Sequence, residues 1–187
     1  MSTALLLIDI QMGFQNPVWG ARNNPAAEDN AADLLAAWRT QDWPVCHVRH
    51  VSVEPNSPLG PDTGGTEFMA QVAPTSDEPI FEKSVNSAFI GTSLESHLRQ
   101  LSVTDLVVCG LTTPHCVSTS SRMAANLGFQ VTLAHDACAA FEANANAGWS
   151  DTAPQMTAQQ IHDSAVSHLH GEFVTARRTA QILADLS

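Results

Sequence analysis

Short runs of apolar residues alternate with longer amphipathic stretches along the chain. Residues 4–8 and 44–51 have the length and apolar content of strands, and apolar residues at helical spacing lie between them. The apolar run 106–109 is followed in the same way by a helical pattern that ends near Leu127. Such alternation is typical of parallel βαβ units, in which helices cover both faces of a buried sheet.

Several predicted helices carry start and stop signals. Asn24-Pro25 supplies an N-cap and a first-turn proline to the first long helix. Residues 92–95 and 157–160 have the spacing of capping boxes, and Gly128 is placed to end the helix that begins at Pro114. The strands are predicted near residues 4, 44, 79, 105 and 130 and, last, at Phe173-Val174, before a final helix over 176–186.

This order of elements predicts the fold class. We expect a three-layer, doubly wound, Rossmann-like α/β fold with a mostly parallel six-stranded sheet, as a single domain over residues 1–187. Ligands of such folds bind beyond the carboxyl ends of the strands. Two long stretches without a regular pattern, 52–78 and 142–156, are expected to shape the ligand pocket.

Composition narrows the choice of partners. The chain has 187 residues, of which 44% are hydrophobic and 14% charged, which fits a folded domain with a buried core. Its formal net charge is −11, and no cluster of Lys and Arg is present to bind a nucleic-acid backbone or an anionic membrane. We therefore predict a small-molecule substrate, with neither nucleic acid nor membrane as a partner.

The cysteines and the N-terminal run point to a cytoplasmic protein. No two cysteines form a C-x-x-C pair, so we predict free thiols in a reducing compartment. The apolar run 4–8 is cut by Asp9 and has no basic region before it, which is unlike a signal peptide or a membrane span. The four cysteines are Cys46, Cys109, Cys116 and Cys138.

Three residues of reactive types follow predicted strands: Asp9, Lys83 and Cys116. Cys116 is expected in the first turn of a helix, where free N–H groups and the helix dipole favour a thiolate and can bind an oxyanion. Its neighbour His115 points about 100° away on a helix, so we set aside a Cys-His dyad. Lys83 is expected to lower the thiol pKa, while Asp9 takes the proton and returns it to the leaving amine. Considered one at a time, Asp9 could be a strand-end cap, Lys83 a surface charge and Cys116 a core thiol. The spacing of the three residues alone does not decide between these structural roles and a catalytic one.

Four segments resemble the isochorismatase-like cysteine hydrolases, which include nicotinamidases and N-carbamoylsarcosine amidohydrolases. They are LLLIDIQMGF (5–14), EKSVNSAFIGTSLESHL (82–98), VVCGLTTPHCVSTSSRMAANLGFQVTLAHDACAAF (107–141) and HLHGEF (168–173). The resemblance implies that Asp9, Lys83 and Cys116 form a catalytic triad with Cys116 as the nucleophile.

The resemblance also implies the surroundings of the nucleophile. A cis peptide bond is expected at Leu111–Thr112, where it would aim the N–H groups of Thr112 and Cys116 at the oxyanion. Gln11, Phe14 and, less strongly, Asn86 are expected to line the substrate pocket. The cis bond and the roles of these residues come from the resemblance and not from spacing.

Departures from the family pattern narrow the chemistry. Isochorismatases proper lack the cysteine, so Cys116 favours hydrolysis of an amide or a related C–N bond. Nicotinamidases carry a metal site after the second strand, where this chain has His47 and His50. Residues three apart on a strand face opposite sides, so these two are poor joint ligands, and we predict no metal, no cofactor and no nicotinamide substrate.

The sequence thus predicts a cysteine-dependent hydrolase of a small-molecule amide that acts through a thioester. The alternative is a non-catalytic or redox-responsive binding protein on the same fold, because an exposed low-pKa thiol is easily oxidised. We expect a homo-oligomer, a dimer or larger, in which Trp149 of one copy lies in a loop that can cover a neighbour's site. His135 follows a strand at the ligand-binding edge, but its role is left open.

Overall fold

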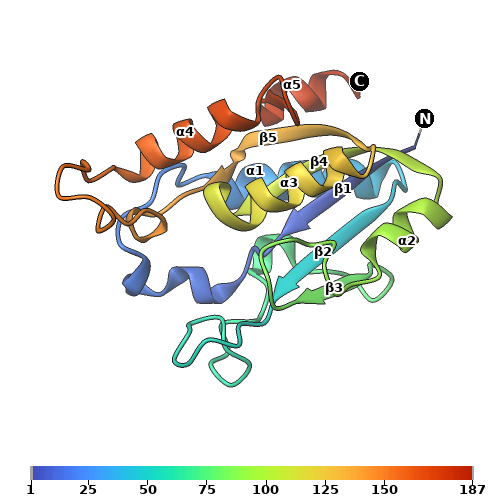
Figure 1. Cartoon of the computed structure of the whole chain (residues 1–187). Coiled ribbons are helices and arrows are strands. Elements are labelled where there is room, and N and C mark those ends of the chain that lie inside the picture. Colours follow the sequence, from blue (N-terminus) through green and yellow to red (C-terminus); the bar gives the residue numbers. More distant parts are fainter. Residues whose placement is uncertain (1, 187) are drawn as a thin grey trace.

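The computed structural model describes residues 2–186 and contains a six-stranded sheet in the order β3-β2-β1-β4-β5-β6 (Figure 1). Every paired strand in it is parallel, where the sequence predicted a mostly parallel sheet. The ends of the predicted domain, Met1 and Ser187, lie outside the described residues. The strands are β1 (Ser2–Ile8), β2 (Val45–His50), β3 (Ile80–Lys83), β4 (Val103–Leu111), β5 (Gln130–Ala139) and β6 (Thr175–Arg177).

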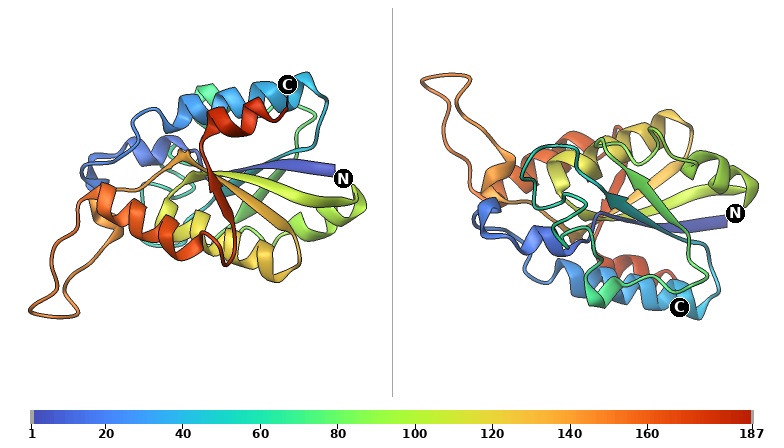
Figure 2. Two further views of the ribbon diagram at one scale, coloured as in Figure 1. Left: turned by 90° about the horizontal axis from the view of Figure 1, so that it is seen from above. Right: turned by 90° about the horizontal axis from the view of Figure 1, so that it is seen from below.

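Helices cover both faces of the sheet, and this arrangement confirms the predicted three-layer α/β fold. Figure 2 shows helices above and below the sheet. The first face carries α1 (Ala27–Thr40) and α5 (Thr179–Ala184), and the second carries α2 (Leu94–Gln100), α3 (Ser118–Asn126) and α4 (Ala158–Leu169).

The strand order reverses beside β1, and this reversal locates the ligand-binding edge. From β1 the chain adds β2 and β3 on one side, and then returns to add β4, β5 and β6 on the other. The side chains of residues 4–8 in β1 are all buried, because the strand has a neighbour on each side and helices above and below. Loops after β1 and β4 diverge at this switch point, which leaves room for a ligand at their carboxyl ends.

The first long helix begins later than its sequence predicts. Asn24 is not its N-cap: the helix starts at Ala27, with Ala26 as the cap residue. The Asn24 side chain instead donates hydrogen bonds to two backbone carbonyls of β5, those of Cys138 (2.7 Å) and His135 (3.2 Å). The Asn24 side chain therefore binds carbonyls that are distant in the sequence instead of capping the helix that follows it.

The two capping boxes have different outcomes. The box at 157–160 is confirmed, since the Thr157 hydroxyl accepts from the Gln160 N–H and the Gln160 side chain accepts from the Thr157 N–H. The box at 92–95 does not form: Ser93 is the cap residue of α2, and the Thr92 hydroxyl donates to the Ala88 carbonyl at 2.6 Å. That hydrogen bond joins residues 88 and 92 within the loop between β3 and α2.

The last strand begins at Thr175, after the two residues at which the sequence predicts it. Phe173 lies in a turn and Val174 forms only an isolated bridge with His170, because the N–H groups of both residues donate to the carbonyl of Leu169 at the end of α4. The strand β6 begins only after this turn, at Thr175. None of the helices described between residues 2 and 186 is long and apolar enough to cross a membrane. The four cysteines are free, as predicted, and all of them are buried, Cys116 included.

Glu78 joins three parts of the fold, and we predict that it supports stability in a pH-dependent way. Its carboxylate accepts from Arg39 of α1 (2.7 Å) and His47 of β2 (2.9 Å). Burial alone would raise its pKa, but these partners and the Thr75 N–H lower it to about 2. A carboxyl whose pKa is lowered on folding stabilises the protein above the unfolded value and loses that effect as pH falls.

Glu78→Gln is therefore expected to lower the free energy of unfolding by about 1–2 kcal/mol at pH 7, after allowance for solvent screening. The difference from the parent should shrink between pH 4.5 and about 2. Urea unfolding at several pH values measures it. Glu82→Gln removes an exposed carboxylate that pairs with Arg49 and should change stability by less than about 0.5 kcal/mol. Equal losses in the two variants would contradict a special role for Glu78.

Candidate active site

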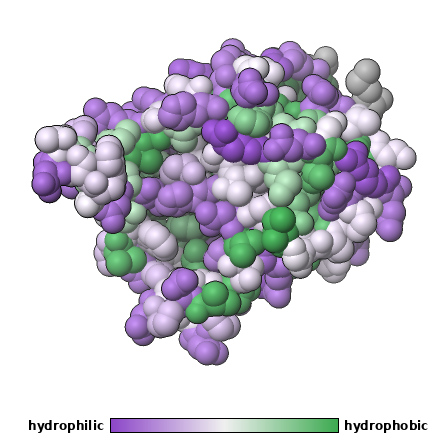
Figure 3. All heavy atoms as spheres, viewed as in Figure 1, coloured by the Kyte–Doolittle hydropathy of each residue, from purple (hydrophilic) through white to green (hydrophobic). Residues whose placement is uncertain are grey.

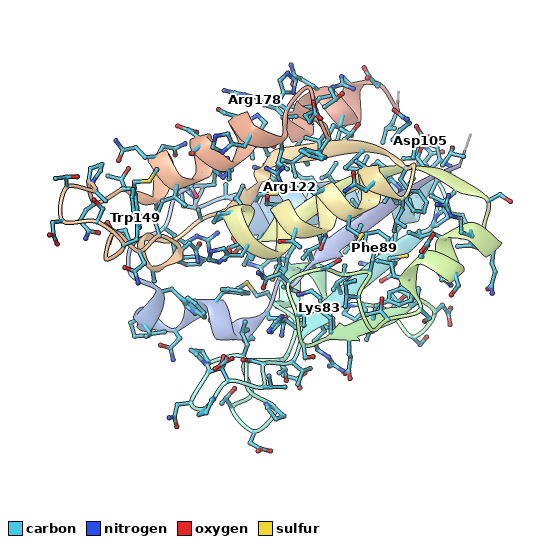
Figure 4. All side chains as sticks on the ribbon, viewed as in Figure 1. Lys83, Phe89, Asp105, Arg122, Trp149 and Arg178 are labelled. Carbon is cyan, nitrogen blue, oxygen red and sulfur yellow. The ribbon has the colours of Figure 1, made fainter. Side chains whose placement is uncertain are left out.

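The carboxyl ends of β1, β3 and β4 bring the three predicted catalytic side chains together. Lys83, labelled in Figure 4, reaches inward from the end of β3. Its Nζ lies 2.5 Å from Oδ2 of Asp9, the residue after β1, and 3.3 Å from Sγ of Cys116. The Asp9 and Lys83 side chains are both 0% exposed, so this ion pair has no contact with bulk water. The interpretations of Lys83 as a surface charge and Cys116 as an isolated core thiol are therefore excluded.

A fourth side chain, His50, belongs to the same cluster and was missed as a site residue. His50 ends β2 and is paired in register with Lys83 of β3, and its Nδ1 lies 3.0 Å from Lys83 Nζ. The same strand-end rule that selected Asp9 and Lys83 would have selected it. The sequence identifies it only as a poor joint metal ligand with His47 and leaves its own role open. His47 points elsewhere: its Nε2 contacts Glu78, and its ring packs edge-on against Phe68.

The Lys83 ammonium is surrounded by three potential metal ligands. A carboxylate oxygen of Asp9, a ring nitrogen of His50 and Sγ of Cys116 lie within 4.8 Å of one another. Such a set suits zinc. Lys83 Nζ, however, is within hydrogen-bond distance of all three side chains, and an ammonium has three N–H donors to give. The lysine, the only one in the chain, thus takes the place of a bound cation.

The structure corrects the expected state of the nucleophile. Burial and the charge of Asp9 together raise the pKa of the Cys116 thiol well above its ordinary value, although Lys83 acts in the opposite direction. Burial also raises the pKa of Asp9, against the lowering effect of Lys83. The prediction that Cys116 rests as a low-pKa thiolate is therefore wrong. The helix dipole and one ammonium do not offset the desolvation of a sulfur anion beside a carboxylate.

Asp9 has the geometry of a proton acceptor for this thiol. Oδ2 is bound to Lys83, whereas Oδ1 is buried without a conventional hydrogen-bond partner among residues 2–186. A buried carboxylate oxygen without a donor is costly. It is also free to accept a proton from Cys116 as the sulfur attacks. The residue has a positive φ of 52°, so its backbone turns sharply at the strand end to aim the side chain inward.

Cys116 lies in a single turn of π-helix, η4 (Thr113–Val117), and not in the regular helix predicted from Pro114. The Thr112 carbonyl accepts from the N–H groups of His115 (3.1 Å) and Val117 (3.3 Å), and neither bond uses the N–H of Cys116. The Leu111–Thr112 peptide bond is cis, at the position that the resemblance implies. Thr112 and Cys116 thus face the same cavity from adjoining parts of one turn.

Contacts with β1 and α4 hold η4, the turn that carries Cys116, in place. Gly110 allows β4 to approach β1 closely, because a Cβ there would lie 2.0 Å from the Ile8 carbonyl oxygen. The Thr113 hydroxyl lies 2.8 Å from Nδ1 of His162 on α4, and both side chains are buried. The turn is therefore held from the sheet on one side and from α4 on the other.

Cys116 opens onto a cavity of about 410 Å³. Figure 3 shows this face of the molecule, with hydrophobic side chains beside the hollow. Phe14 and Asn86 line it as expected, and Asn86 Oδ1 is 3.8 Å from Cys116 Sγ. The walls are formed by Phe14, Val18, Trp19, His50, Ser52, Glu54, Ser57, Pro58, Leu59, Asn86, Thr112, His115, Cys116, Ala143 and Asn144.

Gln11 does not line the cavity, contrary to expectation. Its side chain is fully buried beneath the wall, where Nε2 donates to the carbonyls of His50 (2.9 Å) and Thr66 (3.2 Å). Its Oε1 accepts from the His50 N–H at 2.8 Å. Gln11 therefore holds the end of β2 against the 52–78 loop and positions His50.

The two long loops contribute unequally to the cavity. The start of the 52–78 stretch forms one wall, and only Ala143 and Asn144 represent the 142–156 stretch. The rest of that second loop projects away from the body of the molecule, as Figure 2 shows. Trp149 at its tip is 82% exposed. The loop does not close over the cavity of its own chain, and its contact with a neighbouring copy stays a prediction.

Comparisons with known proteins identify the family to which the chain belongs. The sequence model of the isochorismatase domain matches residues 3–165. The chain is 42% identical over 182 residues to the uncharacterized isochorismatase family protein YrdC of Bacillus subtilis, and the alignment covers 97% of this chain and 95% of that protein. It is 36% identical over 154 residues to a streptothricin hydrolase of Streptomyces noursei, covering 81% of this chain and 54% of that protein.

A solved structure agrees with the sequence matches. An isochorismatase-family protein from Chromobacterium violaceum superposes with a TM-score of 0.92 at 42% identity, covering 99% of this chain and 93% of that one. The chain therefore belongs to the isochorismatase family of hydrolases.

Proposed function

We propose that the protein hydrolyses the C–N bond of a small-molecule amide with Cys116 as the nucleophile. The observation that carries the proposal is the contact of one ammonium, Lys83 Nζ, with Asp9, Cys116 and His50, beside the cavity onto which Cys116 opens. Family membership supports hydrolysis, and the thiol favours an acyl-transfer route through a covalent thioester. A cytoplasmic location and a homo-oligomeric state remain part of the proposal.

In the first half-reaction the Cys116 S–H proton passes to Asp9 as sulfur attacks the amide carbon. The carbonyl electron pair moves to oxygen, and the N–H groups of Thr112 and Cys116 stabilise the oxyanion. Asp9 then gives the proton to the departing nitrogen, the C–N bond breaks, and an amine or ammonia leaves. Lys83 keeps the charge of the cluster balanced throughout, because it stays hydrogen-bonded to Asp9.

In the second half-reaction water attacks the thioester. Asp9 accepts a proton from the water as its oxygen bonds to the acyl carbon, and returns it to the departing Cys116 sulfur. A carboxylic acid is released and the resting thiol is restored. Because a thiolate whose conjugate acid has a raised pKa is a poor leaving group, the proton from Asp9 must reach the sulfur as the C–S bond breaks. The raised pKa also disfavours the alternative of a redox-responsive thiol.

The covalent step can be tested directly. With primary carboxamides as substrates, the protein is expected to release ammonia and to carry an acyl group on Cys116 in intact-protein mass spectra after acid quenching. Cys116→Ala should abolish both signals, a loss of at least about 10³-fold in kcat/KM. Cys46→Ala, which removes a buried thiol of β2 away from the cavity, should leave both unchanged. Ammonia release by Cys116→Ala at the parent rate would overturn the proposal.

A further inference from the structure

The walls of the cavity contain a single ionised side chain, Glu54. No Lys or Arg is among the residues that line it. Burial, and for His50 also the nearby Lys83, lowers the pKa of His50 to about 4, and burial lowers the pKa of His115, so both imidazoles are neutral at pH 7. The Asp9–Lys83 pair behind the wall adds no net charge. A ligand in this cavity therefore meets a net negative charge.

Glu54 is available to a ligand. It is exposed at the start of the 52–78 loop, and its carboxylate has no ion-pair partner within residues 2–186, whereas Glu28, Glu78 and Glu82 are each paired with an arginine. The backbone at this point is held in place, because the Glu54 N–H donates to the Ser52 hydroxyl at 3.1 Å. The cavity lining therefore contains one carboxylate that has no ion-pair partner among residues 2–186, on a backbone held by this hydrogen bond.

Aromatic rings in the same lining add a second attraction for cations. Phe14 and Trp19 both line the cavity, with ring centroids 5.2 Å apart. Trp19 is anchored by its Nε1–H, which donates to the Gly13 carbonyl at 2.8 Å. Phe141 stacks behind Phe14 and already carries the Arg22 guanidinium over its own ring at 5.3 Å. The faces of such rings attract ammonium and guanidinium groups, tryptophan most strongly.

We propose that the substrate is a small amide that also carries a protonated amine. Its carbonyl would lie against Cys116, and its ammonium would be held by the Glu54 carboxylate and the ring of Trp19. This inference rests on the proposed amide hydrolysis and adds the charge class of the substrate. An anionic amide is disfavoured in the same cavity by repulsion from Glu54.

Three amides of equal chain length test the charge preference: 6-aminohexanamide, hexanamide and the monoamide of adipic acid. We expect kcat/KM to be about tenfold higher for the cationic amide than for the neutral one, and lowest for the anionic one. Glu54→Gln should bring the ratio of cationic to neutral close to one, and Glu54→Lys should favour the anionic amide. Glu67→Gln removes an exposed carboxylate of the same loop that does not line the cavity, and should keep the parental ratio.

A binding measurement separates this inference from the proposed hydrolysis. Saturation-transfer NMR on the full-length Cys116→Ala protein should show n-hexylammonium binding more tightly than n-hexanol, and Glu54→Gln should remove the difference. If amides are hydrolysed without regard to charge, the proposed function stands and the cation preference is overturned. If no amide is hydrolysed but the Glu54-dependent binding is present, the cation site stands and the hydrolase proposal fails.

Discussion

Replacing Asp9 by Asn is expected to lower kcat/KM for amide hydrolysis by about 10³-fold. The resting Cys116 thiol is protonated because burial raises its pKa, so attack requires a base, and the free Oδ1 of Asp9 is the one in place. Alkylation of Cys116 by iodoacetamide should slow in parallel. The variant is assayed with the same primary carboxamides, and its fold is checked by circular dichroism.

The pH profile gives this prediction a second readout. Asp9 acts as a base only when ionised, and burial raises its pKa above 3.8, so activity should fall as pH drops through that raised value. Since the chain has one lysine, protein labelled with 15N at lysine Nζ gives one side-chain resonance, which should shift over the same pH range in the parent. Asp62→Asn, in the 52–78 loop, should leave the profile unchanged. An Asp9→Asn protein that is folded and fully active would show that another group accepts the proton.

Replacing Lys83 by Met is expected to lower the free energy of unfolding by about 3–5 kcal/mol at pH 7. The variant leaves the fully buried Asp9 carboxylate without its counter-charge. An acid whose folded pKa lies above its unfolded value stabilises the fold fully below the unfolded pKa, and this effect is lost as pH rises. The deficit of the variant should therefore be smallest near pH 4 and should grow toward neutral pH. Urea unfolding across this range measures the effect.

Two further variants identify the cause of that loss. In Lys83→Met with Asp9→Asn no charge remains buried, so much of the lost stability should return. Lys83→Ala leaves space beside the ligand atoms of Asp9, His50 and Cys116, so Zn²⁺ should raise its melting temperature by several degrees. Adding Cys116→Ala should remove that increase, and the parent should not respond to Zn²⁺. Equal stabilisation of the parent by Zn²⁺ would show that the ammonium does not exclude a metal.

Much of the site could be predicted because parallel sheets bring strand ends together. Asp9, Lys83 and Cys116 follow three different apolar runs, so the prediction that these strands are parallel was enough to place them at one edge. His50 follows the same rule, but its role was left open because the sequence was used to judge it only as a metal ligand. Gln11 was misplaced, because strand position does not show whether a side chain points into a cavity or binds buried carbonyls.

The sequence by itself determined the class of fold and the residue types at the binding edge. Both depend on patterns along the chain: apolar runs alternate with helical spacings, and polar residues follow the runs. The start of α1 shows the limit of such patterns, since Asn24 binds carbonyls of β5 more than a hundred residues away. Local chemistry offers a side chain several partners, and only folding decides which is near.

The tertiary structure alone decided the protonation of the site and the charge of its cavity. The sequence places a cysteine near a lysine and a helix end, which predicts a thiolate. The structure buries that cysteine beside a carboxylate, and desolvation then outweighs the nearby positive charge. In the same way, only the folded arrangement brings Glu54, without an ion-pair partner among residues 2–186, into the cavity lining that also contains Trp19. Burial and the sum of all neighbouring charges set these properties, and both depend on residues that are distant in the sequence.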